Sequence, residues 1–378
     1  MISRWLKCLL VAVFSLFSTF IFAQEGGNEG EKKSFDAAKV IFGHVMDAHE
    51  FHFFSYEGSD GKEHHATIPL PVILYSPQKG FSFFMSSAFH HGEHDYKGYG
   101  LLTEEKIEKD SLDKQKFFAG QIVAVNENGK MDSTIKVFDV SPTRNVVQMI
   151  LSLLLLVWVM LAVAKKYNKG IGVKTAPNGF QNLLEPIITF IKEDVAMPTL
   201  GRKHEKYLPY ILTIFFFILF NNLIGLIPGA ANVTGNIAVT MVLALIAFVV
   251  ILLSTKKQYW GHIFWPPGVP IGVKFILIPV EILGIFTKPF ALMIRLFANM
   301  VAGHIIIISL ISLIFIFGAI NTGLGWGFTP LSVGFVVFIY FIELLVAFLQ
   351  AYIFAFLTAV FIAQAFEGEH HSEDAVLL

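Results

Sequence analysis

Cysteine and charged residues are scarce in this 378-residue chain, and each scarcity argues against a class of function. The only cysteine is Cys8, so a chain processed after this position would have no disulfide, no thiolate nucleophile and no cysteine metal ligand. Charged residues make up 15% of the chain, against about 25% in soluble domains. The net charge of −1 provides no basic excess to neutralise phosphates, which argues against nucleic acid as a partner.

Apolar residues are abundant instead, at 54% of the chain, and they gather in five runs. Each run is close to or longer than the about 20 residues with which a helix crosses a bilayer. The runs are 146–164, 208–228, 236–254, 272–318 and 331–366. The sequence therefore predicts an all-α polytopic membrane domain with five or six membrane helices over residues 146–378.

Residues 1–24 have the pattern of a secretory signal peptide. Arg4 and Lys7 precede an apolar run of about 15 residues, which ends near Ala23. We expect this segment to be removed. The alternative is a retained transmembrane anchor, because the upstream position of the cleavage site lacks a small residue.

Residues 25–145 contain no stretch long enough to span a bilayer, and they predict a small exported domain that is β-rich or α+β. Turn-rich segments alternate there with short β-prone runs. Asn128-Gly129 lies between two such runs and predicts a hairpin, because a type I′ turn requires positive φ at both central residues. Residues 34–49 instead predict an amphipathic helix.

The same region holds eight of the 13 histidines, which makes zinc or copper binding an alternative to consider. Their spacings match no compact ligand pattern and no cysteine assists them, so we interpret them as solvated surface side chains and predict no metal. The eight are His44, His49, His52, His64, His65, His90, His91 and His94.

The positions of the basic residues predict which side of the membrane each loop lies on. The loop 165–207 carries eight Lys and Arg, and the next loop on the same side carries Lys256 and Lys257. The loops 229–236 and 321–330 carry no charge. Because basic loops stay in the cytoplasm, we expect a multi-pass protein of a bacterial plasma (inner) membrane, with the N-terminal domain periplasmic and the C-terminus cytoplasmic.

The last two apolar runs are too long for upright membrane helices. One helix over 331–366 would reach about 54 Å, whereas the hydrocarbon core is about 30 Å thick. Either each run breaks, with Pro279 and Pro289 as break or kink points in the first, or both helices are steeply tilted. Two long tilted helices joined by the uncharged loop would form a hairpin.

Ionisable residues inside these runs are the strongest functional signal. Arg295 lies in an apolar stretch, 291–311, whose only other ionisable residue is His304. A charge in hydrocarbon is costly unless it has a partner or lines a water-filled path, so Arg295 marks a function in ion movement. Glu281 lies two seven-residue steps before Arg295, and it either lines a cytoplasmic water path or pairs with a neighbouring lysine.

Folding the last two runs together about position 325 predicts two intramembrane pairs. Arg295 lies 30 residues before this centre and Gln350 lies 25 after it. His304 lies 21 before and Glu343 lies 18 after. These differences correspond to at most about 8 Å along a helix, so the members of each pair can meet.

The two pairs differ in chemistry. His304 and Glu343 can exchange protons, because imidazole titrates near neutral pH, whereas the guanidinium of Arg295 stays charged. A permanent cation beside a titratable pair suits a device that moves protons without leaking them. For Gln350, and for Asn299 one turn beyond Arg295, hydrogen bonding between helices is the structural alternative.

These residues resemble a known family, subunit a of the F-type ATP synthase, which forms its membrane proton channel. The resemblance covers roughly residues 205–366 and rests on three blocks in the family's order. The blocks are FNNLIGLIPGAANVTGNIAVTMVLAL, KPFALMIRLFANMVAGHIII and IELLVAFLQAYIFAFLTAVFIA. Residues 25–145 depart from the family's common short N-terminus, so the resemblance says little about them.

The resemblance implies that Arg295 is the essential stator arginine, which faces a rotating ring of subunit c whose carboxylates carry protons. Asn299 and Gln350 match polar positions beside it. His304 and Glu343 match an interacting pair, which some relatives have in the reverse order. The resemblance also implies that Glu281 matches an acidic position on the cytoplasmic access route for protons.

The implied partners are the subunit c ring, the subunit b stalk, the remaining ATP synthase subunits and the lipid bilayer. No cofactor is implied, and the chain is not an enzyme by itself, since it has no P-loop. A secondary transporter is the alternative function, although we find no internal repeat of the kind such folds favour. A membrane anchor would gain nothing from buried ionisable groups.

Overall fold

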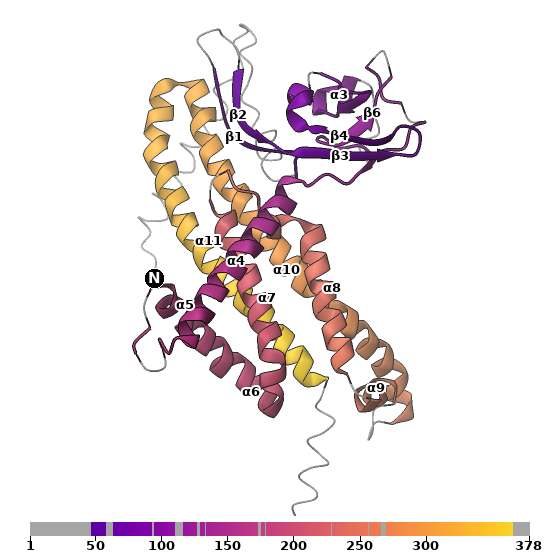
Figure 1. The fold of residues 1–378 in the computed structure, drawn as a ribbon, viewed down its shortest axis with the longest axis vertical. Helices are drawn as coiled ribbons and strands as arrows, with labels where there is room; N and C mark the ends of the chain where they lie inside the picture. Colours follow the sequence, from indigo (N-terminus) through magenta and orange to yellow (C-terminus); the bar gives the residue numbers. More distant parts are fainter. Residues whose placement is uncertain are drawn as a thin grey trace, which may run out of the picture.

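A computed structural model describes residues 47–365 except for 58–62, 93, 110–115, 127–128, 133, 173–174, 178, 228, 256 and 266–269. The predicted signal peptide, 1–24, lies outside the described residues. So does most of the helix predicted at 34–49, and its described part, 47–49, is not helical. Figure 1 shows a bundle of long helices with a small domain of strands at one end.

Within the described residues, five helical stretches are long and apolar enough to cross a membrane, which confirms the prediction of a polytopic helical protein. The second stretch, Phe180–Gly225, joins several shorter elements. The helices are α4 (Arg144–Asn168), α5 (Phe180–Phe190), α6 (Met197–Leu200), α7 (His204–Gly225), α8 (Ile237–Ser254), α10 (Ile271–Ile320) and α11 (Thr322–Gln364), with the short α9 (Lys257–Phe264) before α10.

The basic segment 165–207 is not the loop that its charge suggested, because much of it is helical. α5 continues through a π-helical turn (Ile191–Ala196) into α6. Leu184, Ile191 and Val195 recur at helical spacing and are buried, so this stretch packs one face against α7 and α11 while its charged residues face outward.

The two longest helices settle the choice between broken and continuous runs. α10 is one helix of 50 residues that contains both Pro279 and Pro289, so of the two alternatives the run does not break there. α11 has 43 residues and begins at Thr322, so most of the loop predicted at 321–330 is helix. Asn321 alone lies between the two helices, and its side chain accepts a 2.8 Å hydrogen bond from Gly323 N. This cap satisfies a backbone donor that the turn would otherwise expose.

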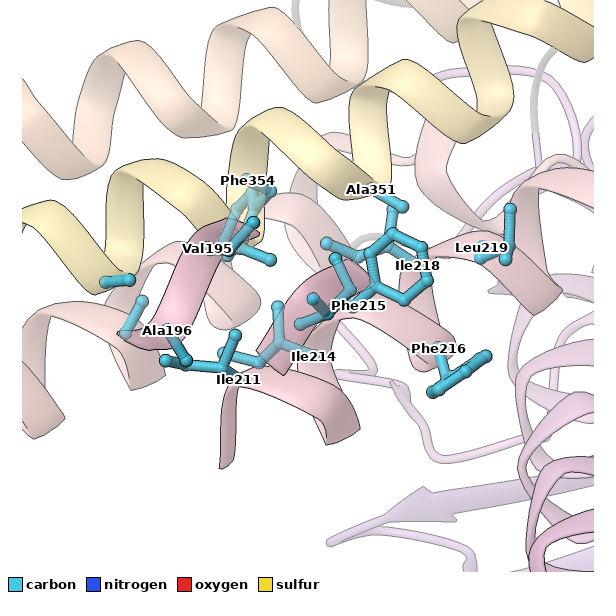
Figure 2. Close-up of a cluster of buried hydrophobic side chains, with 14 of the residues drawn as sticks. Val195, Ala196, Ile211, Ile214, Phe215, Phe216, Ile218, Leu219, Ala351 and Phe354 are labelled. Carbon is cyan, nitrogen blue, oxygen red and sulfur yellow. The ribbon is translucent and has the colours of Figure 1, made fainter. Parts of the chain in front are cut away.

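Small residues on α11 bring the core helices together. Ala347, Ala351, Ala355 and Ala359 recur every four residues and are fully buried, which lets α7 approach α11 closely. Figure 2 shows the resulting cluster, in which Ala351 lies beside Ile218 of α7 and Phe354 lies beside Val195 of the π-helical turn. The core therefore holds α11 from the side of α7 and the π-helical turn.

The N-terminal domain is built from antiparallel strand pairs around an apolar core. Its core residues are Val72, Leu74, Phe84, Phe89, Tyr99 and Ile122. The strands are β1 (Glu50–Glu57) with β2 (Glu63–Pro69), then β4 (Gly80–Met85), β3 (Pro71–Ser76) and β7 (Phe138–Asp139) in that order, and β5 (Tyr99–Leu101) with β6 (Ile122–Ala124). One short helix, α3 (Glu104–Lys109), lies beside β5 and β6.

The hairpin predicted at Asn128-Gly129 is only partly present. The chain does reverse, since Val125 forms an antiparallel bridge with Met131, although Asn128 itself lies outside the described residues. The strand that follows does not stay with β6, because β7 pairs with β3. Asp132 accepts a 3.0 Å hydrogen bond from Thr134 N, and this local turn redirects the chain.

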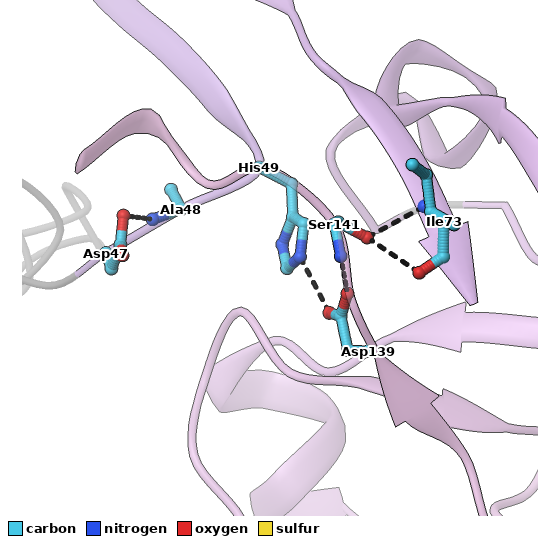
Figure 3. A network of polar contacts seen from close by, with 6 residues as sticks. All are labelled: Asp47, Ala48, His49, Ile73, Asp139 and Ser141. Carbon is cyan, nitrogen blue, oxygen red and sulfur yellow. Dashed lines mark hydrogen bonds and ion pairs between the residues drawn. The ribbon is translucent and has the colours of Figure 1, made fainter. Parts of the chain in front are cut away.

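A polar network joins the domain to the first membrane helix (Figure 3). His49 Nε2 donates to Asp139 at 2.8 Å, and Ser141 Oγ accepts from Ile73 N at 2.9 Å. Nearby, Arg144 N at the start of α4 donates to Ala48 O at 2.9 Å. The start of β1 and the end of β7 are thereby fixed to the start of α4.

Candidate functional site

Arg295 lies on α10 with its side chain directed away from the helix bundle. Leu292 and Leu296 on either side of it along the chain are buried, whereas Arg295 is exposed. The exposed positions that flank it on the same face include two with small side chains, Ala291 and Ala298, together with Asn299. A permanent cation therefore stands on a shallow apolar surface that a partner can approach.

Asn299, one turn after Arg295, links α10 to α11. Its Nδ2 donates a 3.0 Å hydrogen bond to Oε1 of Gln350, which is buried between the helices. The predicted partner of Gln350 was Arg295, and among the described residues no hydrogen bond joins those two side chains. Asn299 lies one helical turn from the predicted partner, and the rotation of α10 about its axis decides which side chain meets Gln350.

His304 and Glu343 lie on the facing surfaces of α10 and α11. Glu343 is buried against the backbone of Gly303, where a Cβ would overlap its carboxyl oxygen. His304 is mostly buried. Within the described residues, neither Nε2 of His304 nor Oε2 of Glu343 has a hydrogen-bond partner. His304 thus follows the residue that Glu343 contacts, and among the described residues no hydrogen bond joins the two side chains.

Glu281 and the lysines around it lie on the part of α10 farthest from the N-terminal domain. Glu281 is exposed. Lys274 is buried with its ammonium 3.9 Å from the centre of the Trp265 ring, and Lys288 donates a 2.7 Å hydrogen bond to Gln364 of α11. Each lysine therefore has a described contact of its own, and the side chain of Glu281 is exposed at the surface.

Sequence reasoning missed a buried polar network that holds α7 and the following loop against both long helices. Asn222 Nδ2 donates to Ala347 O at 3.2 Å, and Asn222 Oδ1 accepts from Thr234 at 2.7 Å. Asn232 Nδ2 donates to Met300 O at 3.2 Å. Ala347 and Met300 lie one turn from Glu343 and His304, so this network fixes the backbone that carries them.

A signal for this network was present in the sequence. Asn221 and Asn222 stand together inside an apolar run, and buried amides in a membrane helix require partners. Asn221 accepts a 2.7 Å hydrogen bond from Ser152 of α4. Gln148, one turn earlier on α4, makes hydrogen bonds with both the N–H and the C=O of Ala231. The site is therefore supported from α4 as well.

The described histidines of the N-terminal domain do not gather into a metal site. Among the described residues, no group of three or more His, Cys, Asp or Glu is placed to hold a metal ion. His49 and His91 instead lie 2.8 Å from the carboxylates of Asp139 and Glu50.

Comparison with known proteins divides the chain in two. Residues 146–363, which span α4 to α11, match the family model described as ATP synthase A chain. Residues 40–141 match a domain of unknown function (DUF8433). The boundary between the matches falls at the junction between β7 and α4.

Curated relatives are similar to the membrane part. An ATP synthase subunit a of Chloroherpeton thalassium is 46% identical over 63% of this chain and 70% of its own length. One from Prosthecochloris aestuarii, subunit a 2, is 44% identical over 63% of this chain and 72% of its own. One from Myxococcus xanthus is 40% identical over 65% and 78%. The chain belongs to the ATP synthase A chain family, that of subunit a.

Proposed function

We propose that this chain is the stator subunit of a rotary ATP synthase, which conducts protons through two offset half-channels to and from the carboxylates of a rotating subunit c ring. Membership of the family places it in ATP synthesis and ion transport in a membrane. The observation that carries the proposal is the position of Arg295, a permanent cation exposed on the apolar surface of α10.

The entry half-channel runs past Glu343 and His304. These residues lie on the side of Arg295 nearer the hairpin turn, with His304 nine residues away, or about 14 Å along the helix. A proton passes from this pair to a ring carboxylate, and the neutral carboxyl then turns into lipid. The unpartnered atoms of both side chains support their role as proton carriers.

The exit half-channel lies on the opposite side of Arg295. Glu281 is 14 residues before it, or about 21 Å along the same helix, and is exposed. An arriving ring carboxyl loses its proton toward Glu281, because the guanidinium of Arg295 stabilises the ionised carboxylate. The same cation repels a proton that would cross directly. Asn299 and Gln350 position the helices at this level.

The domain organisation and topology follow from the same scheme. Residues 1–24 are a signal peptide, 25–145 a periplasmic domain and 146–378 the membrane domain of a bacterial inner-membrane protein with a cytoplasmic C-terminus. The basic residues of 165–207 support this orientation. α10, at about 75 Å, is far longer than the membrane is thick, so it and α11 lie as a steeply tilted hairpin along the ring. The other partners are the subunit b stalk and the remaining synthase subunits.

Arg295→Ala tests the proposal in the assembled complex. We expect the complex to assemble, and proton-driven ATP synthesis in membrane vesicles to fall by at least about 100-fold, because the loss of ionised carboxylate stabilisation exceeds about 3 kcal/mol. Ser309→Ala, at an exposed polar position of the same helix, serves as the matched control and should retain normal synthesis. Normal synthesis by the Arg295→Ala complex would refute the proposal.

A further inference from the structure

One face of the three-stranded sheet in the N-terminal domain is apolar and exposed. Side chains alternate along each strand, so Val72, Leu74 and Phe84 enter the core while their neighbours point the other way. The register pairs Tyr75 with both Phe81 and Phe138, which places all three rings on one face. The exposed fractions there are 78% for Phe81, 64% for Phe83, 52% for Phe138 and 66% for Val140.

This surface, which we call the aromatic face, consists of Tyr75, Phe81, Phe83, Met85, Phe138 and Val140. The ring of Tyr75 lies 4.8 Å from that of Phe81 and 6.3 Å from that of Phe138, so the face is continuous. None of its six residues is acidic, and the exposed Lys136 lies two residues before Phe138. A contiguous apolar patch of this kind on a small domain marks an interaction surface.

The position of the face is fixed relative to the membrane. Val140 is four residues before Arg144, so their Cα atoms are at most about 14 Å apart. Ser141, which lies between them in the chain, forms a hydrogen bond with Ile73, and Asp139 forms one with His49 (Figure 3). α4 is about 37 Å long, slightly more than the about 30 Å of a hydrocarbon core, so if this helix crosses the membrane its first turn is close to the membrane surface.

The face is on the membrane side of its domain. The elements that cover the opposite face of the sheet include β5 and β6. In Figure 1, β3 and β4 lie on the side of the domain toward the start of α4, with α3 and β6 on the other side, while β1 and β2 lie beside the tips of α10 and α11. On α4, exposed apolar residues begin at Val146 and continue through Ile150 and Leu151. Along the chain, the aromatic face is thus followed by exposed apolar side chains of the kind that a lipid-facing helix carries.

We propose that the aromatic face rests in the membrane–water interface on the side of the N-terminal domain, and anchors that domain to the lipid surface. Aromatic rings are favoured in the headgroup region, where their apolar bodies leave water and their edges remain near polar groups. Lys136 beside the face suits lipid phosphates. This proposal rests on the membrane helices and the sheet, and it holds whether or not Arg295 acts as the stator arginine.

The test measures what surrounds residue 83 in the full chain within its complex. Phe83→Cys in a Cys8→Ser background is labelled with a nitrobenzoxadiazole fluorophore, and the complex is reconstituted in phosphatidylcholine vesicles. One set of vesicles includes a lipid with a nitroxide near its headgroup, and another receives aqueous iodide. Lys109→Cys, exposed at the end of α3, is the matched control in the same domain, and Phe81→Cys provides a second position on the face.

We expect the nitroxide lipid to reduce fluorescence from residue 83 at least about two-fold, and iodide to have little effect, because a probe in the headgroup region is shielded from water. The probe at 109 should respond in the opposite way. Iodide quenching at 83 equal to that at 109 would overturn the proposal. Protection of 83 from both quenchers would also overturn it, since protein, either another subunit or a second copy, would then cover the face.

Discussion

Asn299 of α10 donates a hydrogen bond to the side chain of Gln350 on α11, and the two atoms are 3.0 Å apart. This contact holds the helices together one turn from Arg295. It leaves the guanidinium without a described partner in its own subunit and exposed at the surface. In the proposed function, a ring carboxylate that approaches Arg295 therefore does not have to displace an internal acceptor.

Gln350→Leu removes the acceptor of this hydrogen bond and keeps a buried side chain of similar volume. We expect the rate of proton-driven ATP synthesis to fall roughly five-fold, which corresponds to about 1 kcal/mol. The reason is that Asn299, and with it the surface of α10 that carries Arg295, loses its hydrogen bond to α11. The rate is measured in vesicles at equal complex content. An Asn299→Ala variant should show a similar loss, and no change in either would contradict a positioning role.

Gly303→Ala should displace the carboxyl group of Glu343, because a Cβ at 303 overlaps its Oε1. We expect ATP synthesis to fall at least about ten-fold, since proton transfer depends on placement within about 1 Å. Glu343→Asp in the same chain shortens the side chain by one CH₂ and should restore part of the activity. Gly284→Ala on the same helix, where a Cβ meets nothing within 4 Å, is the control. Full activity of Gly303→Ala would count against the described position of Glu343.

Exchanging the two titratable residues tests whether they act as a pair. His304→Glu with Glu343→His keeps one imidazole and one carboxyl at the helix interface. We expect this double variant to synthesise ATP faster than either single variant, measured as initial rates in vesicles. A double variant as inactive as the singles would show that each residue has a separate requirement.

The junction network should make the N-terminal domain sensitive to acid. Burial of Asp139 by itself would raise the pKa of its carboxyl, but hydrogen bonds from His49 and Ser141 outweigh burial and hold the pKa below its ordinary value. A carboxyl with a lowered folded-state pKa stabilises the fold above the unfolded pKa of about 3.9. That contribution is lost as the pH falls through the folded value.

Proteolysis at the junction, followed from pH 7 to pH 3, measures this effect. We expect cleavage to increase below about pH 4, where the unfolded and then the folded carboxyl bind protons. Asp139→Asn should be cleaved faster at pH 7 and should change less on acidification. Parallel pH profiles for the two chains would contradict the assignment to Asp139.

The topology can be tested at the tip of the hairpin. Gly325 is unsuitable for labelling, because a Cβ there would lie 2.8 Å from Gly318 Cα. At Gly327 a Cβ meets nothing within 4 Å, so Gly327→Cys should be tolerated. We expect a membrane-impermeant maleimide to label it from the periplasmic side, and Asn182→Cys in α5 to be labelled from the cytoplasm. The reverse pattern would invert the proposed orientation.

Much of the membrane part was predictable because the bilayer imposes simple lengths. Apolar runs of 18 residues or more marked the spans, and counting along two facing helices placed Gln350 near the correct level. The Asn299–Gln350 contact is centred between residues 324 and 325, where the predicted centre was 325. A helix rises by a constant distance per residue, so the number of residues between two side chains is enough to estimate how far apart they lie along the helix axis.

The exact turn and the side-chain partners were not predictable in the same way. The segment 321–330 was predicted as a loop because it separates two apolar runs. A helix capped by Asn321 satisfies more backbone groups, and in an apolar setting this requirement outweighs the sequence pattern. Whether Arg295 or Asn299 reaches Gln350 depends on how far α10 is rotated about its axis. Packing of α10 against α8 and the 229–236 loop decides that rotation, and the pairing of β7 with β3 depends on equally distant residues.

The single residue between α10 and α11 has a mechanical consequence. Sliding one helix along the other by a turn, 5.4 Å, would require Asn321 and its neighbours to unwind. The distance along the helices from Glu343 to Arg295 is therefore fixed, and in the proposed mechanism it is the same for both directions of rotation. In the proposed motor, direction depends on the balance between ion gradient and ATP supply, and this subunit needs no rearrangement to run either way.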